Sequence, residues 1–405
     1  MTKEKVLFID AFSTIHVGNG ALLDNSIKAC KVKFNNPTFT IITSDTKTNK
    51  GRYENVVEDV FSNYPGTNLK KLLWTGVFFL NCSIAWFFYK LKVNSKFIPI
   101  SSRYKKVFKA IIESDKIISI SGETLNDHFM PQMYQRCYLF KICINLKKDL
   151  YIFPQSIGPI FRKSSFVILR TALSGAKEIY GRDKESFSLA KKIWGGCSVN
   201  VSYSPDVAVL QDSIINETAP IFQSNKKVIG LTLSDFPNEI QKGVGDIDLI
   251  IQSCVKSFNS NDYAFYLMPS NYKYNEKSND YVICEYAHEY LTGLGYECLI
   301  LSDEPIFPEE YQAIQKGLFI FISTRMHVGI LATVGSTPTI MINTQHKIRG
   351  YMENINMGKQ VVEVGSINDN LSTVIGETII DNAAIKEQLK EENIKMRLEL
   401  HKALA

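Results

Sequence analysis

Arg325 and His327 are the residues in this sequence best able to do chemistry together. They are the first and last residues of the tripeptide Arg-Met-His, which comes shortly after the apolar run 318–323. In extended backbone, side chains two positions apart point the same way, so both can address one ligand if the next helix begins after them. Arginine supplies a permanent cation for phosphate or carboxylate, and histidine donates or accepts a proton near neutral pH. The alternative is that His327 caps or packs near the start of that helix.

Further cationic residues also follow strand-like runs. Arg182 comes directly before Asp183, which is the expected cap of the next helix. Arg182 is therefore left at the sheet edge, where it either forms a surface ion pair or binds a phosphate or carboxylate group in a bidentate manner. Lys347 and Arg349 come at the start of a later helical segment. They either add positive charge to the ligand site or form a solvated basic turn.

Glycines follow the first strand-like run. Gly18, Asn19 and Gly20 precede a helical pattern, so their amides either face an anion or form a simple turn. Neither of the glycine-rich nucleotide-binding patterns, G-x-G-x-x-G and G-x-x-x-x-G-K-[ST], is present in this loop. The loop is therefore a weaker candidate for an anion site than the Arg-Met-His segment.

Two more loops carry polar residues at strand ends. In the first, Glu123 follows Gly122 and either orients a sugar hydroxyl or caps the next helix. In the second, Gln155 and Ser156 precede Gly158, which permits close approach of the backbone to a ligand. We expect these five residues to bind an acceptor or a phosphate.

The elements that must position these residues alternate between short apolar runs and helical patterns. Such alternation predicts parallel sheets covered on both faces by helices. The strand-like runs are 6–10, 39–43, 97–100, 116–121, 150–154, 178–181, 199–203, 227–234, 264–269, 297–302, 318–323, 339–343 and 361–364. The helical patterns lie near 21–33, 53–62, 66–92, 102–114, 129–147, 162–175, 183–193, 244–259, 276–293, 309–316, 326–335, 346–356 and 368–380.

The pattern predicts an α/β fold of two Rossmann-like, doubly wound domains that face each other across a GT-B-like cleft. We expect an N-terminal domain over 1–210 on the acceptor side, a linker over 211–226 and a C-terminal domain over 227–380 on the donor side. A charged helix over 381–405 could return to the first domain. In such sheets ligands bind beyond the carboxyl ends of the strands.

Several of these segments resemble the polysaccharide pyruvyl transferase family. The resemblance is carried by ISISGETL (118–125), FPQSIGPI (153–160), YGRDKES (180–186), SPDVAV (204–209), STRMHVGILATVGSTPTIMI (323–342) and the following Lys347. It implies a GT-B-like fold and transfer of a pyruvyl group from phosphoenolpyruvate onto two hydroxyls of one sugar, as a cyclic ketal. Arg182, Arg325 and His327 match the donor positions of that family, and we place Met326 and Lys347 with them. His327 is expected to act as general acid or general base.

The resemblance also sets the expected partners. The acceptor is expected to be a glycan of a surface polysaccharide or exopolysaccharide, or its lipid-linked precursor. No cofactor is expected, and no Cys/His cluster has the spacing of a metal site. One alternative is a GT-B glycosyltransferase that uses a nucleotide sugar, for which Glu353 is the acidic residue nearest the ribose position. The other is a non-catalytic scaffold homologue.

Charge is distributed unevenly along the chain, with an excess of 14 positive charges over residues 1–210 and of 9 negative charges over 211–405. Ten of the basic residues lie between 70 and 116, around the apolar segment 72–91. That segment is a buried helix, a helix in a membrane interface or a transmembrane span. We expect contact with an anionic membrane rather than nucleic acid, for which no motif is seen. The expected location is cytoplasmic, or peripheral at the inner face of the cytoplasmic membrane.

Overall fold

The computed structural model describes residues 3–61, 68–120, 122–214, 220–234, 245–272 and 279–404. The chain forms two compact units, and neither is continuous in sequence. Unit 1 contains Met1–Ser13, Leu22–Asp206 and Leu400–Ala405, and unit 2 contains Thr14–Ala21 and Val207–Glu399. Residues 14–21, which we expected in the N-terminal domain, therefore belong to unit 2. Of the expected linker over 211–226, residues 215–219 lie outside the described residues.

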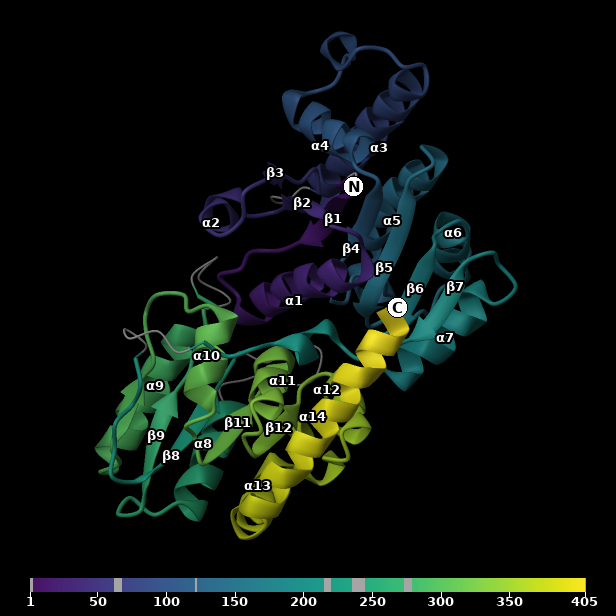
Figure 1. Ribbon diagram of the computed structural model, residues 1–405. Coiled ribbons are helices and arrows are strands. Elements are labelled where there is room, and N and C mark those ends of the chain that lie inside the picture. The colour runs from purple at the N-terminus through teal and green to yellow at the C-terminus, as the bar shows by residue number, and fades with distance from the viewer. Residues whose placement is uncertain are drawn as a thin grey trace. The chain divides into compact units, whose positions relative to one another are not determined.

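Unit 1 is built on a parallel sheet of seven strands in the order β3-β2-β1-β4-β5-β6-β7 (Figure 1). The strands are β1 (Lys5–Ala11), β2 (Thr38–Thr43), β3 (Val56–Glu58), β4 (Lys116–Ser119), β5 (Asp149–Gln155), β6 (Glu178–Gly181) and β7 (Asn200–Tyr203). The helices are α1 (Val17–Lys33), α2 (Thr46–Lys50), α3 (Asn68–Lys90), α4 (Ser102–Glu113), α5 (Met130–Asn145), α6 (Lys163–Leu173) and α7 (Lys184–Trp194). The first turn of α1 belongs to unit 2.

Unit 2 is built on a parallel sheet of six strands in the order β10-β9-β8-β11-β12-β13. The strands are β8 (Lys227–Thr232), β9 (Tyr263–Leu267), β10 (Cys298–Ile300), β11 (Ile320–Ser323), β12 (Thr339–Asn343) and β13 (Val361–Glu363). The helices are α8 (Gly245–Ser257), α9 (Asp280–Gly293), α10 (Pro308–Gln315), α11 (Met326–Val334), α12 (His346–Asn354), α13 (Ile367–Ile380) and α14 (Asn382–Leu404). The end of α14 belongs to unit 1.

The central strands of each sheet are buried on both faces and are runs of apolar residues without polar alternation. In β1, Val6 to Ile9 are at most 1 % exposed, and in β11 all four residues are buried. All eight cysteines are free thiols, seven of them buried and Cys197 half-buried. The parallel, doubly covered sheets predicted from the alternating pattern are therefore present in both units.

Two predicted elements of unit 1 are wrong. The run 97–100 is not a strand but a 3₁₀ turn, η1 (Ser95–Phe97), followed by extended backbone. Pro99 lacks the amide hydrogen that a strand ladder needs, and only Ile98 and Ile100 turn inward. The segment 53–62, expected to be helical, instead contains the short half-exposed edge strand β3.

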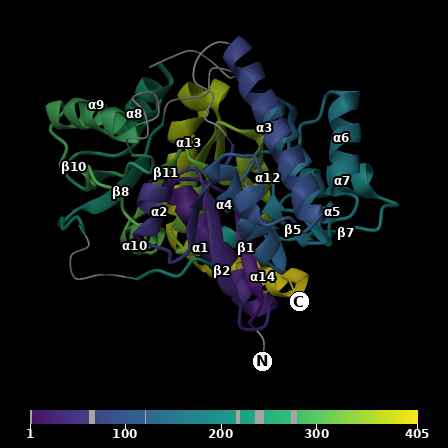
Figure 2. The same ribbon diagram turned by 90° about the horizontal axis from the view of Figure 1, so that it is seen from above.

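Helix α3 is apolar on all sides but buried on one side only. It packs against α4 and α5 (Figure 2), and its inner residues Phe78, Cys82 and Ala85 are at most 1 % exposed. Its outer residues, among them Leu73 and Leu80, remain largely exposed. The interpretation of 72–91 as a buried core helix is therefore wrong for the outer face.

Candidate functional site

The carboxyl ends of the central strands of unit 2 carry a set of polar loops that are bonded to one another. The amide of Thr324, after β11, donates to Thr232 O at 3.0 Å. Thr344, after β12, donates its hydroxyl to Thr324 O at 3.1 Å. The hydroxyls of Ser234 and Thr324 lie 2.9 Å apart. These bonds fix the loops from which α11 and α12 begin, so the residues at those helix starts are held in place.

Arg325 is the N-cap residue of α11 and has extended backbone. Its Nη2 donates to Asp280 Oδ1 at 2.6 Å, and Asp280 is 1 % exposed. The other oxygen of Asp280 accepts from the amide and hydroxyl of Ser270 and from the amide of Asn271. Arg325 Nε is buried, and no described residue lies within hydrogen-bonding distance of it. The guanidinium is thus oriented by one buried carboxylate and keeps a donor that has no partner in the described part of the chain.

His327 lies in the first turn of α11, because the helix begins at Met326. The helix expected over 326–335 is therefore present, and the condition that the whole Arg-Met-His tripeptide be extended is met by Arg325 alone. Gly18 of α1 sits directly against the histidine: a Cβ placed on Gly18 would be 2.7 Å from His327 Cβ. Met326 is buried, at 7 % exposure. The position of His327 is consequently set by α1 as well as by its own helix.

His16 also belongs to this cluster, although its spacing in the sequence predicts no role for it. Burial, and then the charges of Arg325, His327 and Lys347, lowers the pKa of His16 well below its usual value. The imidazole is therefore neutral at pH 7 and lies among three groups that carry or can carry positive charge. Its Nδ1 is buried and has no hydrogen-bond partner among the described residues. The only signal in the sequence was its place between the first strand and Gly18.

Lys347 lies in the first turn of α12 and is 8 % exposed. Arg349, two residues later, instead lies at the surface, where its Nη2 donates to Glu363 Oε1 at 2.6 Å. The two residues therefore differ in role: buried Lys347 belongs to the cluster around half-buried His16, and Arg349 forms the solvated basic turn.

The cluster in unit 2 suits an anionic ligand. Arg325 and Lys347 are permanent cations at neutral pH, and Asp280 is the carboxylate paired with Arg325. The amide ends of α11 and α12 add positive potential, since helix N-termini attract anions. Two buried polar atoms, Arg325 Nε and His16 Nδ1, are left without partners in the described structure, and such atoms usually have a ligand or water to bind. The arrangement can hold phosphate or carboxylate beside two imidazoles.

Arg182 belongs to unit 1, where it forms a buried rather than a surface ion pair. Its Nη1 donates to Asp206 Oδ2 at 2.8 Å and its Nε donates to Ser156 Oγ at 3.0 Å. Both charged side chains are at most 2 % exposed. Gln155 O accepts from the amide of Arg182, so this loop and the start of α7 are joined. Asp183 caps α7, as expected.

The remaining predicted residues of unit 1 lie in two loops that contact each other. The amide of Ser156 donates to Gly122 O, and the amide of Gly158 donates to Leu125 O. Gly158 has a φ of +93°, and a Cβ at this position would lie 2.5 Å from Leu189 Cδ2, so a side chain there would be strained. Glu123 is half-buried and does not cap the following turn.

The cap of that turn, η2 (Asp127–Phe129), is Asn126. Its side chain accepts from the amides of His128 and Phe129. The helix-cap interpretation of Glu123 is therefore wrong, and its expected role toward an acceptor stays a prediction.

Asn19 and Gly20, predicted as a weaker site for an acceptor or a phosphate in the N-terminal domain, lie in unit 2 with Gly18. A Cβ on Gly20 would be 3.0 Å from Pro308 Cγ, which explains why a small residue stands there. The structure thus brings Asn19, Gly20, Arg325, Met326, His327 and Lys347 together in unit 2, and Gly122, Glu123, Gln155, Ser156, Gly158 and Arg182 together in unit 1.

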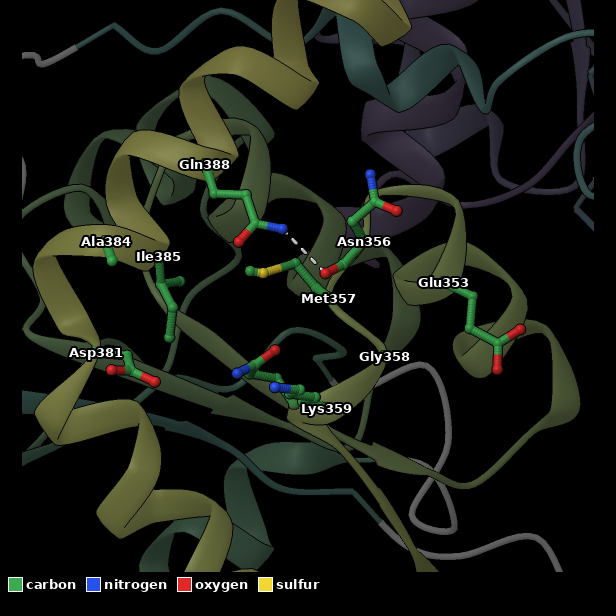
Figure 3. Close-up of a pocket in the computed structure, with 10 residues that line it drawn as sticks. Glu353, Asn356, Met357, Gly358, Lys359, Asp381, Ala384, Ile385 and Gln388 are labelled. Carbon is green, nitrogen blue, oxygen red and sulfur yellow. Dashed lines mark hydrogen bonds between the residues drawn. The ribbon is translucent and has the colours of Figure 1, made fainter.

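A hollow of about 740 Å³ lies elsewhere in unit 2, where α12 and η4 (Gly358–Gln360) meet α13 and α14 (Figure 3). It is lined by Glu353, Asn356, Met357, Gly358, Lys359, Gln360, Asp381, Ala384, Ile385 and Gln388. Its charged groups are two carboxylates and one lysine, so it does not favour a strongly anionic ligand. Gln388 Nε2 donates to Asn356 O at 3.0 Å across it. Among the described residues, no group of three or more His, Cys, Asp or Glu could hold a metal ion.

Comparison with known proteins places this geometry in a family. The sequence model of the polysaccharide pyruvyl transferase family matches residues 16–346, from His16 to the start of α12. No curated protein matches the chain.

Solved structures of low sequence identity share the fold. One is UDP-GlcNAc 2-epimerase from Neisseria meningitidis bound to UDP-GlcNAc (TM-score 0.55, 13 % identity, 100 % of this chain and 98 % of that chain). Another is trehalose-6-phosphate synthase OtsA (TM-score 0.57, 9 % identity, 99 % of this chain and 97 % of that chain). A third is Anabaena HepE in complex with UDP (TM-score 0.54, 11 % identity, 100 % of this chain and 97 % of that chain). The predicted class, two Rossmann-like α/β domains of GT-B type, is confirmed.

Proposed function

The chain belongs to the polysaccharide pyruvyl transferase family, and from that membership we propose that it moves a pyruvyl group from phosphoenolpyruvate onto a sugar. The product would be a cyclic ketal on a glycan of a surface polysaccharide or exopolysaccharide, with release of phosphate. The observation that carries the proposal is the cluster in which half-buried Arg325 and His327 and buried Lys347 surround the half-buried His16.

The donor fits the charge of this cluster. Phosphoenolpyruvate carries about three negative charges near pH 7 from one phosphate and one carboxylate. Arg325 has a buried Nε without a partner among the described residues, and Lys347 adds a second cation beside His16. A doubly functional anion of this kind satisfies both donors, and it gains from the amide ends of α11 and α12. Arg182, predicted as a further donor ligand, bonds to Asp206 through Nη1 and to Ser156 through Nε, and its role toward the donor stays a prediction.

The two histidines suit the proton transfers. The methylene carbon of the donor gains a proton, a sugar hydroxyl bonds to the neighbouring carbon, and the carbon–oxygen bond to phosphate breaks. A second hydroxyl of the same sugar then closes the ketal, and its proton leaves with phosphate. We assign the proton donation to His327 and place neutral His16 as acceptor of the first hydroxyl proton. Negative charge on the donor would offset the cations that lower the pKa of His16, and so make it a better base once the donor is bound.

The test is incubation of full-length protein with phosphoenolpyruvate and lipid-linked or free glycan extracts. We expect phosphate release that depends on the acceptor, together with the mass gain of one pyruvyl ketal on the glycan. Arg325→Ala and His327→Ala should each lower the rate at least about a hundred-fold, because each removes a group that acts on the reacting atoms. Arg349→Ala is the matched control, since its guanidinium pairs with surface Glu363, and it should retain the wild-type rate.

Other results would contradict the proposal. Unchanged rates in both site variants would overturn the site, while leaving the family intact. The solved structures named above include proteins bound to UDP or a UDP-sugar. Acceptor-dependent release of nucleotide from a sugar nucleotide, with none of phosphate from phosphoenolpyruvate, would therefore mean a glycosyltransferase. No turnover of either donor would favour a scaffold.

A further inference from the structure

Helix α3 exposes an unusually apolar face for a protein surface. Its outer residues Leu69, Leu73, Val77, Leu80 and Phe87 are 45–67 % exposed, and neighbouring Leu72 is 69 % exposed. At about 100° per residue these five positions form one stripe along the helix, opposite the buried residues. Among the described residues, one helix is long and apolar enough to cross a membrane, Leu69–Lys90. Only 17 % of the residues in its most apolar stretch are buried. Contiguous apolar surface of this kind usually marks an interaction site.

The inner face of α3 argues against a membrane-spanning position. Phe78, Cys82 and Ala85 belong to the main core of unit 1. Ser83 Oγ lies 2.6 Å from Tyr138 OH of α5, and the rings of Phe78 and Phe61 stack 5.7 Å apart. A span would have to pull all these groups out of the core. The helix therefore keeps its inner face on unit 1 and offers only the stripe.

Positive charge surrounds the stripe. Lys70 and Lys90 lie on either side of it by helical position, and both are exposed. Beyond the end of α3, Lys92 and Lys96 are also exposed, as is Phe97 of η1, at 77 %. Between residues 68 and 97 the sequence has five lysines and no acidic residue. An apolar face bordered by lysines matches a bilayer surface, where acyl chains lie beneath anionic headgroups.

We propose that this face docks the protein on an anionic membrane, with α3 lying in the plane of the interface. The leucines and Phe97 enter the boundary between headgroups and acyl chains, and the lysines contact lipid phosphates. A second copy of the chain is a poorer occupant, since a symmetric contact would bring the same lysines against one another. The proposal is independent of the proposed transferase activity, because it rests on unit 1 surface residues alone.

The test uses full-length protein and sedimentable vesicles of phosphatidylcholine with and without phosphatidylglycerol. We expect binding to the mixed vesicles at low salt, a blue shift in tryptophan emission from Trp74, and little binding to phosphatidylcholine alone. At 1 M salt, where the Debye length is about 3 Å, binding should weaken strongly. Replacing Lys70 or Lys90 by Gln should weaken the partition about five-fold each, the equivalent of about 1 kcal/mol per lysine.

The apolar stripe has a matched control on another helix. Leu73→Gln/Leu80→Gln should lower vesicle partition at least about ten-fold. Ile394→Gln/Leu398→Gln, which changes two exposed residues of α14, should bind as wild type does. Circular dichroism checks that both variants fold. The proposal is overturned if Leu73→Gln/Leu80→Gln binds like wild type, or if no vesicles bind at low salt. It is also overturned if the stripe variant abolishes a lipid-free dimer while wild type ignores vesicles.

Discussion

Gly18 and His327 touch so closely that the type of residue at position 18 controls the imidazole. A Cβ at position 18 would lie 2.7 Å from His327 Cβ and 3.3 Å from His327 Nδ1. Gly18→Ala should therefore displace His327 and lower turnover at least about ten-fold, the cost of a small misplacement of a reacting group. Thermal stability should change little, because alanine favours a helix by about 0.5–1 kcal/mol and partly offsets the contact.

The control for Gly18→Ala is a helical glycine in open surroundings. Gly376 of α13 has no atom within 4 Å of the position its Cβ would take. Gly376→Ala should leave turnover unchanged and raise the melting temperature slightly. Equal turnover in the Gly18 and Gly376 variants would mean that α1 does not set the position of His327.

His16 makes stability depend on pH with a defined sign. Its pKa is lowered well below the usual value by burial and by Arg325, His327 and Lys347. Below pH about 6.5 the unfolded chain binds a proton at this residue and the folded chain does not, so acidification destabilises the fold. From pH 7 upward the residue contributes no pH dependence.

Replacing His16 by Gln removes the proton that the unfolded chain binds at this residue below pH about 6.5. Both proteins should lose unfolding free energy when the pH falls from 7 to 5, and the loss should be about 1–2 kcal/mol smaller in the variant. The reason is that uptake of one proton by the unfolded chain changes the unfolding free energy by about 1.4 kcal/mol per pH unit. Urea titrations at the two pH values measure the difference. Parallel losses in the two proteins would show that His16 titrates normally in the fold.

At the scale of elements, α14 holds the far end of the helix that carries His327. Asn393 Nδ2 donates to the carbonyl oxygens of Thr333 and Val334 at 2.9 and 3.1 Å, at the last turn of α11. Asn393→Ala would leave these carbonyls without that donor, and should lower the unfolding free energy by about 1–3 kcal/mol. Urea unfolding measures it. Ile394→Ala, at a 63 % exposed neighbour, should stay within about 0.5 kcal/mol of wild type.

The elements also show what the sequence can and cannot predict. Runs such as 318–323 and 339–343 were predicted as strands because both faces of a parallel sheet are buried, so the middle of each strand is continuously apolar. The edge strand β3 was missed because it is three residues long and half-exposed. The environment of α3 was left open between a buried and an interfacial helix, because composition alone cannot distinguish buried apolar residues from exposed ones.

The site was predictable where its residues directly follow a strand-like run. Arg325 and His327 were found because they share one strand end. Asp280 lies 45 positions before Arg325, and its contact with that residue depends on the sheet order of unit 2. His16 joins the cluster only because residues 14–21 belong to unit 2, where the amide of Val17 donates to Ser270 O.

At the scale of the whole molecule, the last residues of the chain complete the packing of unit 1. Leu400 and Leu404 are at most 1 % exposed. Tyr180 donates its hydroxyl to Ala403 O at 3.0 Å, and Lys33 Nζ donates to Leu404 O at the same distance. Removing residues 400–405 should lower the stability of unit 1 by at least about 2 kcal/mol, because two buried leucines are lost.

Tryptophan fluorescence isolates this effect, since Trp74, Trp86 and Trp194 all belong to unit 1. In urea, the fluorescence transition of the truncated protein should move to lower concentration than that of wild type. Lys402→Ala, at an exposed position of the same turn, should leave it in place. An unshifted transition after truncation would mean that the final turn of α14 adds nothing to unit 1.

The exchange of short segments between the units also bears on how the protein is made. Residues 14–21 leave the ribosome early but must wait for strands that lie beyond residue 226 before they can pack. Residues 22–206 emerge next, yet residues 400–405 follow only after all of 207–399. Neither unit can therefore reach its final packing before the end of α14 has been made, although domains usually fold one after another as they emerge. A nascent chain of this protein would expose unfinished core surface, a binding site for chaperones, until its C-terminal helix is complete.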